Sequence, residues 1–124
     1  MARSERQKLK LLYIKDLLEQ QSDETHPLST QAIVDALARQ GIQAERKSVY
    51  DDIACLQQYG MDIVCIRGPG GGYFLASRPF ELPELKLLVD AVQSSRFLTE
   101  KKSMQLIAKL GTLASREQAG SLRR

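Results

Sequence analysis

The segment Arg67–Leu75, RGPGGGYFL, constrains the fold of this chain more than any other. Four of the eight glycines in the 124 residues fall within positions 68–72. A phosphate-binding loop places its glycines at fixed offsets before a helix, because its backbone N–H groups must converge on one anion. Neither G-x-x-x-x-G-K-[ST] nor G-x-G-x-x-G fits, and an aromatic, strand-forming run follows instead of a helix. The segment therefore does not predict a nucleotide site.

Runs on both sides of this loop have the composition of strands. Ile63–Ile66 is rich in β-branched side chains, and Tyr73–Leu75 is aromatic and apolar. The glycines between them allow a sharp turn and a close approach to another backbone. The sequence therefore predicts a β-hairpin with a flexible tip.

Three helices are predicted before the hairpin. The first spans residues 4–21, where four apolar side chains recur at helical spacing: Leu11, Ile14, Leu17 and Leu18. Ser29 can cap the second helix, and Gly41 ends it. The third covers residues 46–59, closes at Gly60 and places three apolar residues on one face: Val49, Ile53 and Leu56.

The second and third helices are separated by about four residues that include a glycine, which is the layout of a helix-turn-helix. A hairpin that follows such a pair directly is a wing. We therefore predict a mainly α fold with a small β-hairpin (α+β). It consists of a winged helix-turn-helix domain over residues 1–78, followed by a helical linker or dimerisation segment over residues 79–124.

The segment after the hairpin predicts two more helices. Pro83 suits position N1 of the first, and Thr99 can cap the second. Their apolar side chains present more surface than could be buried if the two helices folded back on the winged domain. We therefore expect two chains to pair as a homodimer through residues 81–115, using Leu85, Leu88, Val89, Val92, Leu106, Ile107, Leu110 and Leu113. We expect residues 116–124 to be frayed.

Charge and hydropathy narrow the possible partners. The net charge is only +3, but basic side chains crowd the start of the chain: Arg3, Arg6, Lys8, Lys10 and Lys15. Such a patch can bind nucleic acid, and a solvated helix face is the alternative. No apolar run approaches the roughly 18 residues of a membrane span, and no signal-peptide cleavage site follows the basic start. We expect a cytoplasmic protein that does not bind membranes.

Enzymatic and metal chemistry find no support in the residue pattern. His26 is the single histidine and lacks a nucleophile in a motif context, and Cys55 and Cys65 are too isolated for a zinc site or a disulfide framework. Asp51 and Asp52 are neighbours on a helix and point about 100° apart, so they do not converge on one ion. We predict no catalytic residues, no metal and no cofactor. We expect Asp52 to form a salt bridge or hydrogen bond within its domain.

The run ERKSVYDDIACLQQYGMDIV, the glycine-rich wing and FELPELKLLVDAVQSSRFLTEKKS together resemble the N-terminal part of the WYL-domain transcriptional regulators. The resemblance covers nearly the whole chain from about residue 5. It implies a winged helix-turn-helix that binds DNA, followed by a WYL domain, a β-rich module that senses an effector. This chain stops where that domain would begin, as either a fragment or a natural short form. Asp51 departs from the family, in which many members carry Arg, so we assign it no phosphate contact.

A recognition helix presents its first residues to base edges in the major groove, while the preceding helix and the wing contact phosphates. We therefore predict that the start of the third helix faces DNA, through Arg46, Lys47, Ser48 and Tyr50. The two basic side chains can donate to guanine O6 and N7 or to a phosphate, and Ser48 can bond either. Tyr50 has an alternative, which is packing against the first helix.

Residues outside this helix complete the predicted DNA-binding site. Ser29 and Thr30 can bond a phosphate through hydroxyls and free N–H groups, and helix capping is compatible with this role. Arg67 flanks the wing, where it either reaches a phosphate or the minor groove or is simply an exposed arginine at a strand end. Arg3 and Arg6 extend the site to the basic start of the chain.

The sequence thus predicts a sequence-specific transcriptional regulator whose partner is double-stranded DNA. The alternative is a winged-helix module that binds another protein, because ten acidic residues balance ten basic ones up to Arg78. The salt dependence of binding distinguishes the two functions. Affinity for DNA should fall steeply as salt rises, because counterions compete with the phosphate contacts.

Overall fold

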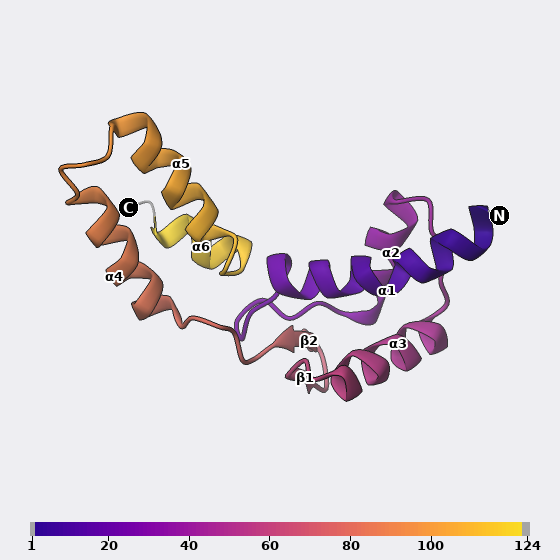
Figure 1. The fold of residues 1–124 in the computed structure, drawn as a ribbon. Coiled ribbons are helices and arrows are strands. Elements are labelled where there is room, and N and C mark those ends of the chain that lie inside the picture. The colour runs from indigo at the N-terminus through magenta and orange to yellow at the C-terminus, as the bar shows by residue number, and fades with distance from the viewer. Residues whose placement is uncertain (1, 123–124) are drawn as a thin grey trace. The chain divides into compact units, whose positions relative to one another are not determined.

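The computed structural model describes residues 2–122, with side chains from residue 6 onward. These residues form a mainly helical fold with one small antiparallel sheet, as predicted (Figure 1). The elements follow in the order α1 Ala2–Gln21, α2 Thr30–Arg39, α3 Arg46–Tyr59, β1 Ile63–Ile66, β2 Gly72–Leu75, α4 Leu82–Gln93, α5 Glu100–Gly111 and α6 Arg116–Leu122. The chain divides into two compact units, Met1–Ser77 and Arg78–Arg124.

The helix ends in the first unit follow the signals in the sequence. Ser29 Oγ accepts the backbone N–H of Ala32 at 3.0 Å, so the predicted cap of α2 is confirmed. Gly41 follows α2 with a φ of 78°, a left-handed conformation that glycine adopts without strain. Gly60 ends α3 in the same way, with a φ of 128°. These two glycines set the short connection between α2 and α3 and the tight exit toward the hairpin.

The core of the first unit forms where α1, α2, α3 and the hairpin meet. The predicted inner face of α3 is confirmed, because its three apolar residues are all buried. On α1, Ile14 and Leu18 are fully buried, while Leu11 and Leu17 pack against the core half-exposed. Ten buried side chains make up this core: Ile14, Leu18, Ile33, Leu37, Ile42, Val49, Ile53, Leu56, Ile63 and Leu75.

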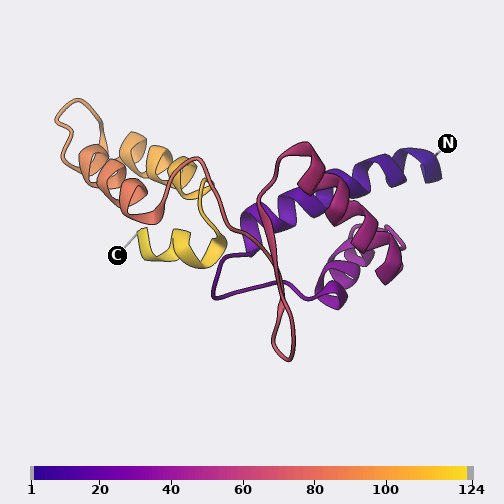
Figure 2. The same ribbon diagram turned by 90° about the horizontal axis from the view of Figure 1, so that it is seen from below.

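The hairpin is held to the helices by a third segment of chain. Its strands pair from Ile63 opposite Leu75 to Ile66 opposite Gly72. Leu28, just before α2, exchanges two backbone hydrogen bonds with Tyr73, of 2.8 and 2.7 Å. A Cβ at Gly72 would lie only 2.3 Å from the carbonyl oxygen of Leu28, so this pairing requires glycine there. Figure 2 shows the loop between the strands extending away from the three helices.

A buried ion pair joins α1 to α3. Lys10 lies four residues before Ile14, so it continues the inward face of α1, and it is only 4% exposed. Its Nζ lies 2.7 Å from Oδ2 of Asp52 and donates a hydrogen bond to Oγ of Ser48. The salt bridge expected of Asp52 is confirmed, whereas Lys10 does not belong to the basic surface at the start of the chain.

The second unit is a three-helix cluster around a smaller core. Figure 1 shows α4 and α5 as neighbouring helices that run in opposite directions. The core consists of Leu85, Val89, Ile107, Ala114 and Leu122. Thr99 caps α5 by accepting the N–H of Lys102 at 3.2 Å, as predicted. Helix α4 begins at Leu82, one residue earlier than predicted, so Pro83 occupies its second position.

The expectation of a frayed end is wrong for residues 116–122, while residues 123 and 124 lie outside the described residues. Residues 116–122 form α6, and Leu122 is only 4% exposed because it packs into the core of the second unit. At the start of this helix, the backbone N–H of Gln118 donates a hydrogen bond to Oγ of Ser115. Burial of Leu122 and Ala114 stabilises a helix too short to be stable by itself.

Candidate nucleic-acid interface

A hollow of about 380 Å³ lies where the starts of α2 and α3 meet the hairpin; we call it the wing concavity. Five of the residues predicted to bind DNA line it, although they come from three separate segments of the chain: Ser29, Thr30, Arg46, Tyr50 and Arg67. Three glycines of the hairpin loop and of β2 form part of its wall. The fold therefore brings most of the predicted site together.

The wing concavity is positively charged, although the unit that contains it is not. Residues 1–77 hold nine basic and ten acidic side chains. The described residues that line the concavity include Arg46 and Arg67 but no aspartate or glutamate. Hydroxyl and amide groups around these arginines supply further hydrogen-bond donors. An anion such as a phosphate group would therefore meet donors and positive charge without a carboxylate in the lining.

The start of α2 contributes donors from one side. The hydroxyl oxygen of Ser29 accepts the capping bond, which leaves its own O–H free to donate. Thr30 is the first residue of α2, where backbone N–H groups lack partners inside the helix. The partial positive charge of a helix N-terminus adds to the attraction for an anion. Capping and phosphate contact are thus compatible in this geometry.

Arg46 is held by a residue that the sequence analysis missed. Its Nη2 donates to Oε1 of Gln31 at 3.1 Å, and Nε2 of Gln31 donates to Oδ1 of Asp35 at 2.8 Å. Gln31 and Asp35 are four residues apart on α2, so they lie on one face of that helix. In the sequence, the four-residue spacing of Gln31 and Asp35 is the one sign of this role. The bond to Arg46 could not be foreseen, because Gln31 and Arg46 lie on different helices of the helix-turn-helix.

Two tyrosines line the wing concavity, one from α3 and one from β2. Tyr50 is 47% exposed and lies outside the core of the first unit, so the structure does not show the alternative packing against α1. Tyr73 is half-buried, and this burial raises the pKa of its phenol above the ordinary value, with Cys65 adding to the shift. A tyrosine phenol is protonated at neutral pH even without this shift, so it can donate a hydrogen bond.

Three other predicted residues lie outside the wing concavity. Lys47 is exposed on the first turn of α3. Ser48 is half-buried and accepts a hydrogen bond from Lys10, so its hydroxyl faces α1 instead of a DNA groove. Arg6 donates from Nη1 to the carbonyl oxygen of Gly41 at 3.1 Å and so braces the turn between α2 and α3. The side chain of Arg3 lies outside the described residues.

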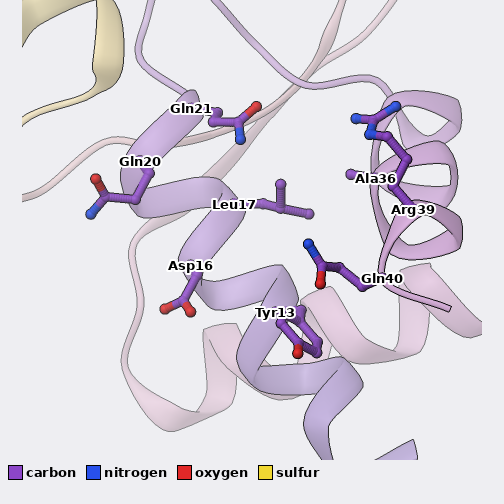
Figure 3. A pocket seen from close by; sticks show the side chains of 8 residues that line it. All are labelled: Tyr13, Asp16, Leu17, Gln20, Gln21, Ala36, Arg39 and Gln40. Carbon is purple, nitrogen blue, oxygen red and sulfur yellow. The ribbon is translucent and has the colours of Figure 1, made fainter. Parts of the chain in front are cut away.

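A second hollow of about 310 Å³ lies between α1 and α2 in the first unit. Figure 3 shows Leu17 and Ala36 pointing into it from the two helices, with Arg39 and Gln40 beside them. Asp16 also lines it, so this hollow contains charges of both signs. None of the residues predicted to bind DNA lines it, and it lacks the clustered positive charge of the wing concavity.

The groups considered for other chemistry are dispersed in the structure. Nδ1 of His26 lies 2.8 Å from Oδ1 of Asp23 in the loop between α1 and α2. Cys55 and Cys65 are exposed free thiols. Among the described residues, no three His, Cys, Asp or Glu side chains gather closely enough to hold a metal ion. No helix within residues 2–122 is long and apolar enough to cross a membrane.

No protein-family model, curated protein or solved structure matches this chain. We therefore infer its function from the shape, charge and donors of the wing concavity. These three properties suit a ligand that is anionic, extended and rich in hydrogen-bond acceptors.

Proposed function

We propose that the first unit binds double-stranded DNA as the sequence-reading part of a transcriptional regulator. The observation that carries this proposal is the wing concavity, where two arginines and the start of a helix converge without an acidic side chain in the lining. A helix-turn-helix followed by a hairpin has the shape that enters a major groove with one helix and contacts the backbone with its flanks. The resemblance of the sequence to the N-terminal part of WYL-domain regulators supports the same function.

The residues take different roles in this proposal. Arg46, oriented by Gln31, donates its planar pair of N–H groups to guanine O6 and N7. Lys47 on the same turn adds a second positive charge at the groove. Ser29, Thr30 and Arg67 lie on both sides of Arg46 and contact phosphates, which fixes the register of α3 on the duplex.

A protein-binding function has one observation in its favour. Val64 and Ile66 on β1 are 37% and 40% exposed, so the hairpin offers apolar surface as well as charge. A protein ligand would use this surface, and its binding would depend weakly on salt. DNA binding depends steeply on salt, because each neutralised phosphate releases bound counterions.

The test is binding to a labelled duplex of roughly 20 bp, about two helical turns. Sites are first selected from a random pool, and fluorescence anisotropy then measures affinity at several salt concentrations. The double variant Arg46→Ala, Lys47→Ala should bind the selected site at least tenfold more weakly, since each good base contact contributes about 1–3 kcal/mol. Both side chains are exposed, so their truncation removes nothing from the core.

A charge-matched control comes from elsewhere in the first unit. Lys15→Ala, Arg39→Ala also removes two positive charges, but neither residue lines the wing concavity. This control should keep at least half of the wild-type affinity. If both double variants lose affinity equally, α3 does not read the DNA. If binding to every duplex is absent or insensitive to salt, the DNA-binding proposal fails.

A further inference from the structure

The hollow between α1 and α2, which we call the α1–α2 hollow, has an apolar floor. Its volume of about 310 Å³ lies at the lower end of the range for small-molecule sites. Leu17 and Ala36 point into it from the two helices (Figure 3). Ala36 is only 9% exposed, and Leu17 packs against the core of the first unit, so both are held in place. A small apolar group that settled on this floor would be removed from water.

The rim of the α1–α2 hollow carries one charge of each sign. Asp16 belongs to α1 and Arg39 to the last turn of α2, and Figure 3 shows them on opposite sides of Leu17. No ion pair joins them, and neither makes an ion pair with any other residue whose side chain is described. The charges therefore remain available to a ligand that brings the opposite charge to each.

Uncharged polar groups complete the rim. Gln21 and Gln40 line the hollow with amides, which both donate and accept hydrogen bonds, and Figure 3 shows the amide of Gln40 pointing toward Leu17. Tyr13 adds an aromatic ring and a hydroxyl group. A ligand with short polar ends and an apolar middle or side chain would find partners for each part.

We infer that the α1–α2 hollow binds a free amino acid with an apolar side chain. The planar guanidinium of Arg39 donates two N–H groups to the carboxylate of the ligand, and the carboxylate of Asp16 accepts from its ammonium group. The apolar side chain covers Leu17 and Ala36. A simple anion would meet Asp16 and a simple cation would meet Arg39, so a zwitterion suits the rim better than either. This inference does not depend on DNA binding by the first unit.

The test is a titration of the full chain, labelled with ¹⁵N, followed by NMR chemical shifts. The probes are L-leucine, L-methionine and L-phenylalanine, each added to about 20 mM because a small open site binds weakly. At least one of them should give a saturable shift with a dissociation constant of about 1 mM or below. The largest shifts should belong to backbone amides at Leu17, Ala36 and Arg39.

Derivatives of the tightest probe show which charge each residue recognises. Its amide lacks the carboxylate and its N-acetyl derivative lacks the ammonium group, and each should bind at least fivefold more weakly than the amino acid, because one charged contact is lost. Arg39→Gln should abolish the preference for the amino acid over its amide. Asp16→Asn should abolish the preference over the N-acetyl derivative. Lys8→Gln and Asp51→Asn, at exposed residues outside the hollow, are the matched controls and should leave the affinity within about twofold of wild type.

The inference fails if none of the three probes gives a saturable shift, or if the shifts that saturate lie away from the α1–α2 hollow. It also fails if Asp16→Asn and Arg39→Gln, with spectra that show them folded, keep both preferences of the wild-type chain. Both side chains are exposed, so neither change removes a group from the core. A loss of preference confined to the matching derivative would be unexplained by a general change in stability.

Discussion

Removal of the buried lysine of α1 should destabilise the first unit strongly. In Lys10→Met, the carboxylate of Asp52 loses the ammonium group that lies 2.7 Å from its Oδ2, and no other group among the described residues donates a hydrogen bond to this oxygen. Breaking one side of a buried ion pair costs about 3–5 kcal/mol. The side chain of Asp52 is 23% exposed, so some solvation remains and we expect the lower end, about 3 kcal/mol. For a unit of this size the midpoint of thermal unfolding should fall by about 12 °C or more.

The chain offers a selective probe and a matched control for this experiment. All four tyrosines precede Ser77 and there is no tryptophan, so tyrosine fluorescence follows the unfolding of the first unit alone. Lys15 pairs with Glu19 at 3.0 Å on the same helix, but both side chains are about one-third exposed. Lys15→Met should therefore cost less than about 1 kcal/mol.

A double variant separates charge from packing. Lys10→Met, Asp52→Leu replaces both charges with apolar groups of similar size, so its stability should return to within about 1 kcal/mol of wild type. Two results would contradict this reasoning. One is a free energy of unfolding for Lys10→Met within about 0.5 kcal/mol of wild type, and the other is a double variant less stable than Lys10→Met. Either would mean that Lys10→Met does not leave a costly buried charge on Asp52.

Three further changes test the site. Gln31→Ala releases Arg46 and should reduce discrimination between a selected site and a mismatched one by about three- to tenfold in competition anisotropy. Affinity for a random duplex should stay unchanged, and an equal loss of affinity for the selected site and for the random duplex would contradict the positioning role. Arg67→Ala should weaken binding to all duplexes about equally and lower the salt slope by about one, whereas an altered sequence preference would mean that the wing reads bases. Gly72→Ala should destabilise the hairpin in urea unfolding, because its Cβ would meet the backbone of Leu28. Gly70→Ala is the control: its Cβ would have no atom within 4 Å, so only the backbone strain of its φ of 75° remains and the cost should be clearly smaller.

The first unit was predictable because its signals are local. Ser29, Gly41 and Gly60 each determine a helix end by their own conformational preferences, and each stands where the structure needs it. The buried face of α3 followed from spacing alone. By contrast, α6 is only seven residues long, and its formation depends on Leu122 reaching a core built from α4 and α5. No window of sequence around residues 116–122 contains that information.

Pairings across elements were the other kind of feature that sequence did not reveal. Lys10 counted as part of a basic surface, although its position four residues before Ile14 places it on the buried face of α1. Its burial depends on Asp52, forty-two residues later in the chain. Gln31 was overlooked for the same reason, since it gains its role only when the helix-turn-helix brings Arg46 to it. Charge and polarity indicate such residues poorly until their partners are known.

Helix geometry explains why the residues predicted at the start of α3 do not all lie on one side of the helix. Residues on an α-helix advance by about 100° each, so Arg46 and Tyr50 lie about 40° apart and both line the wing concavity. Ser48 lies about 200° from Arg46, and it bonds to Lys10 on α1. The predicted residues therefore divide between two sides of α3. Arg46 and Tyr50 line the wing concavity, while Ser48, together with Asp52 one turn later, fixes the orientation of α3 against α1. A change on the inner side of this helix should consequently affect DNA binding only through the angle at which the outer side is presented.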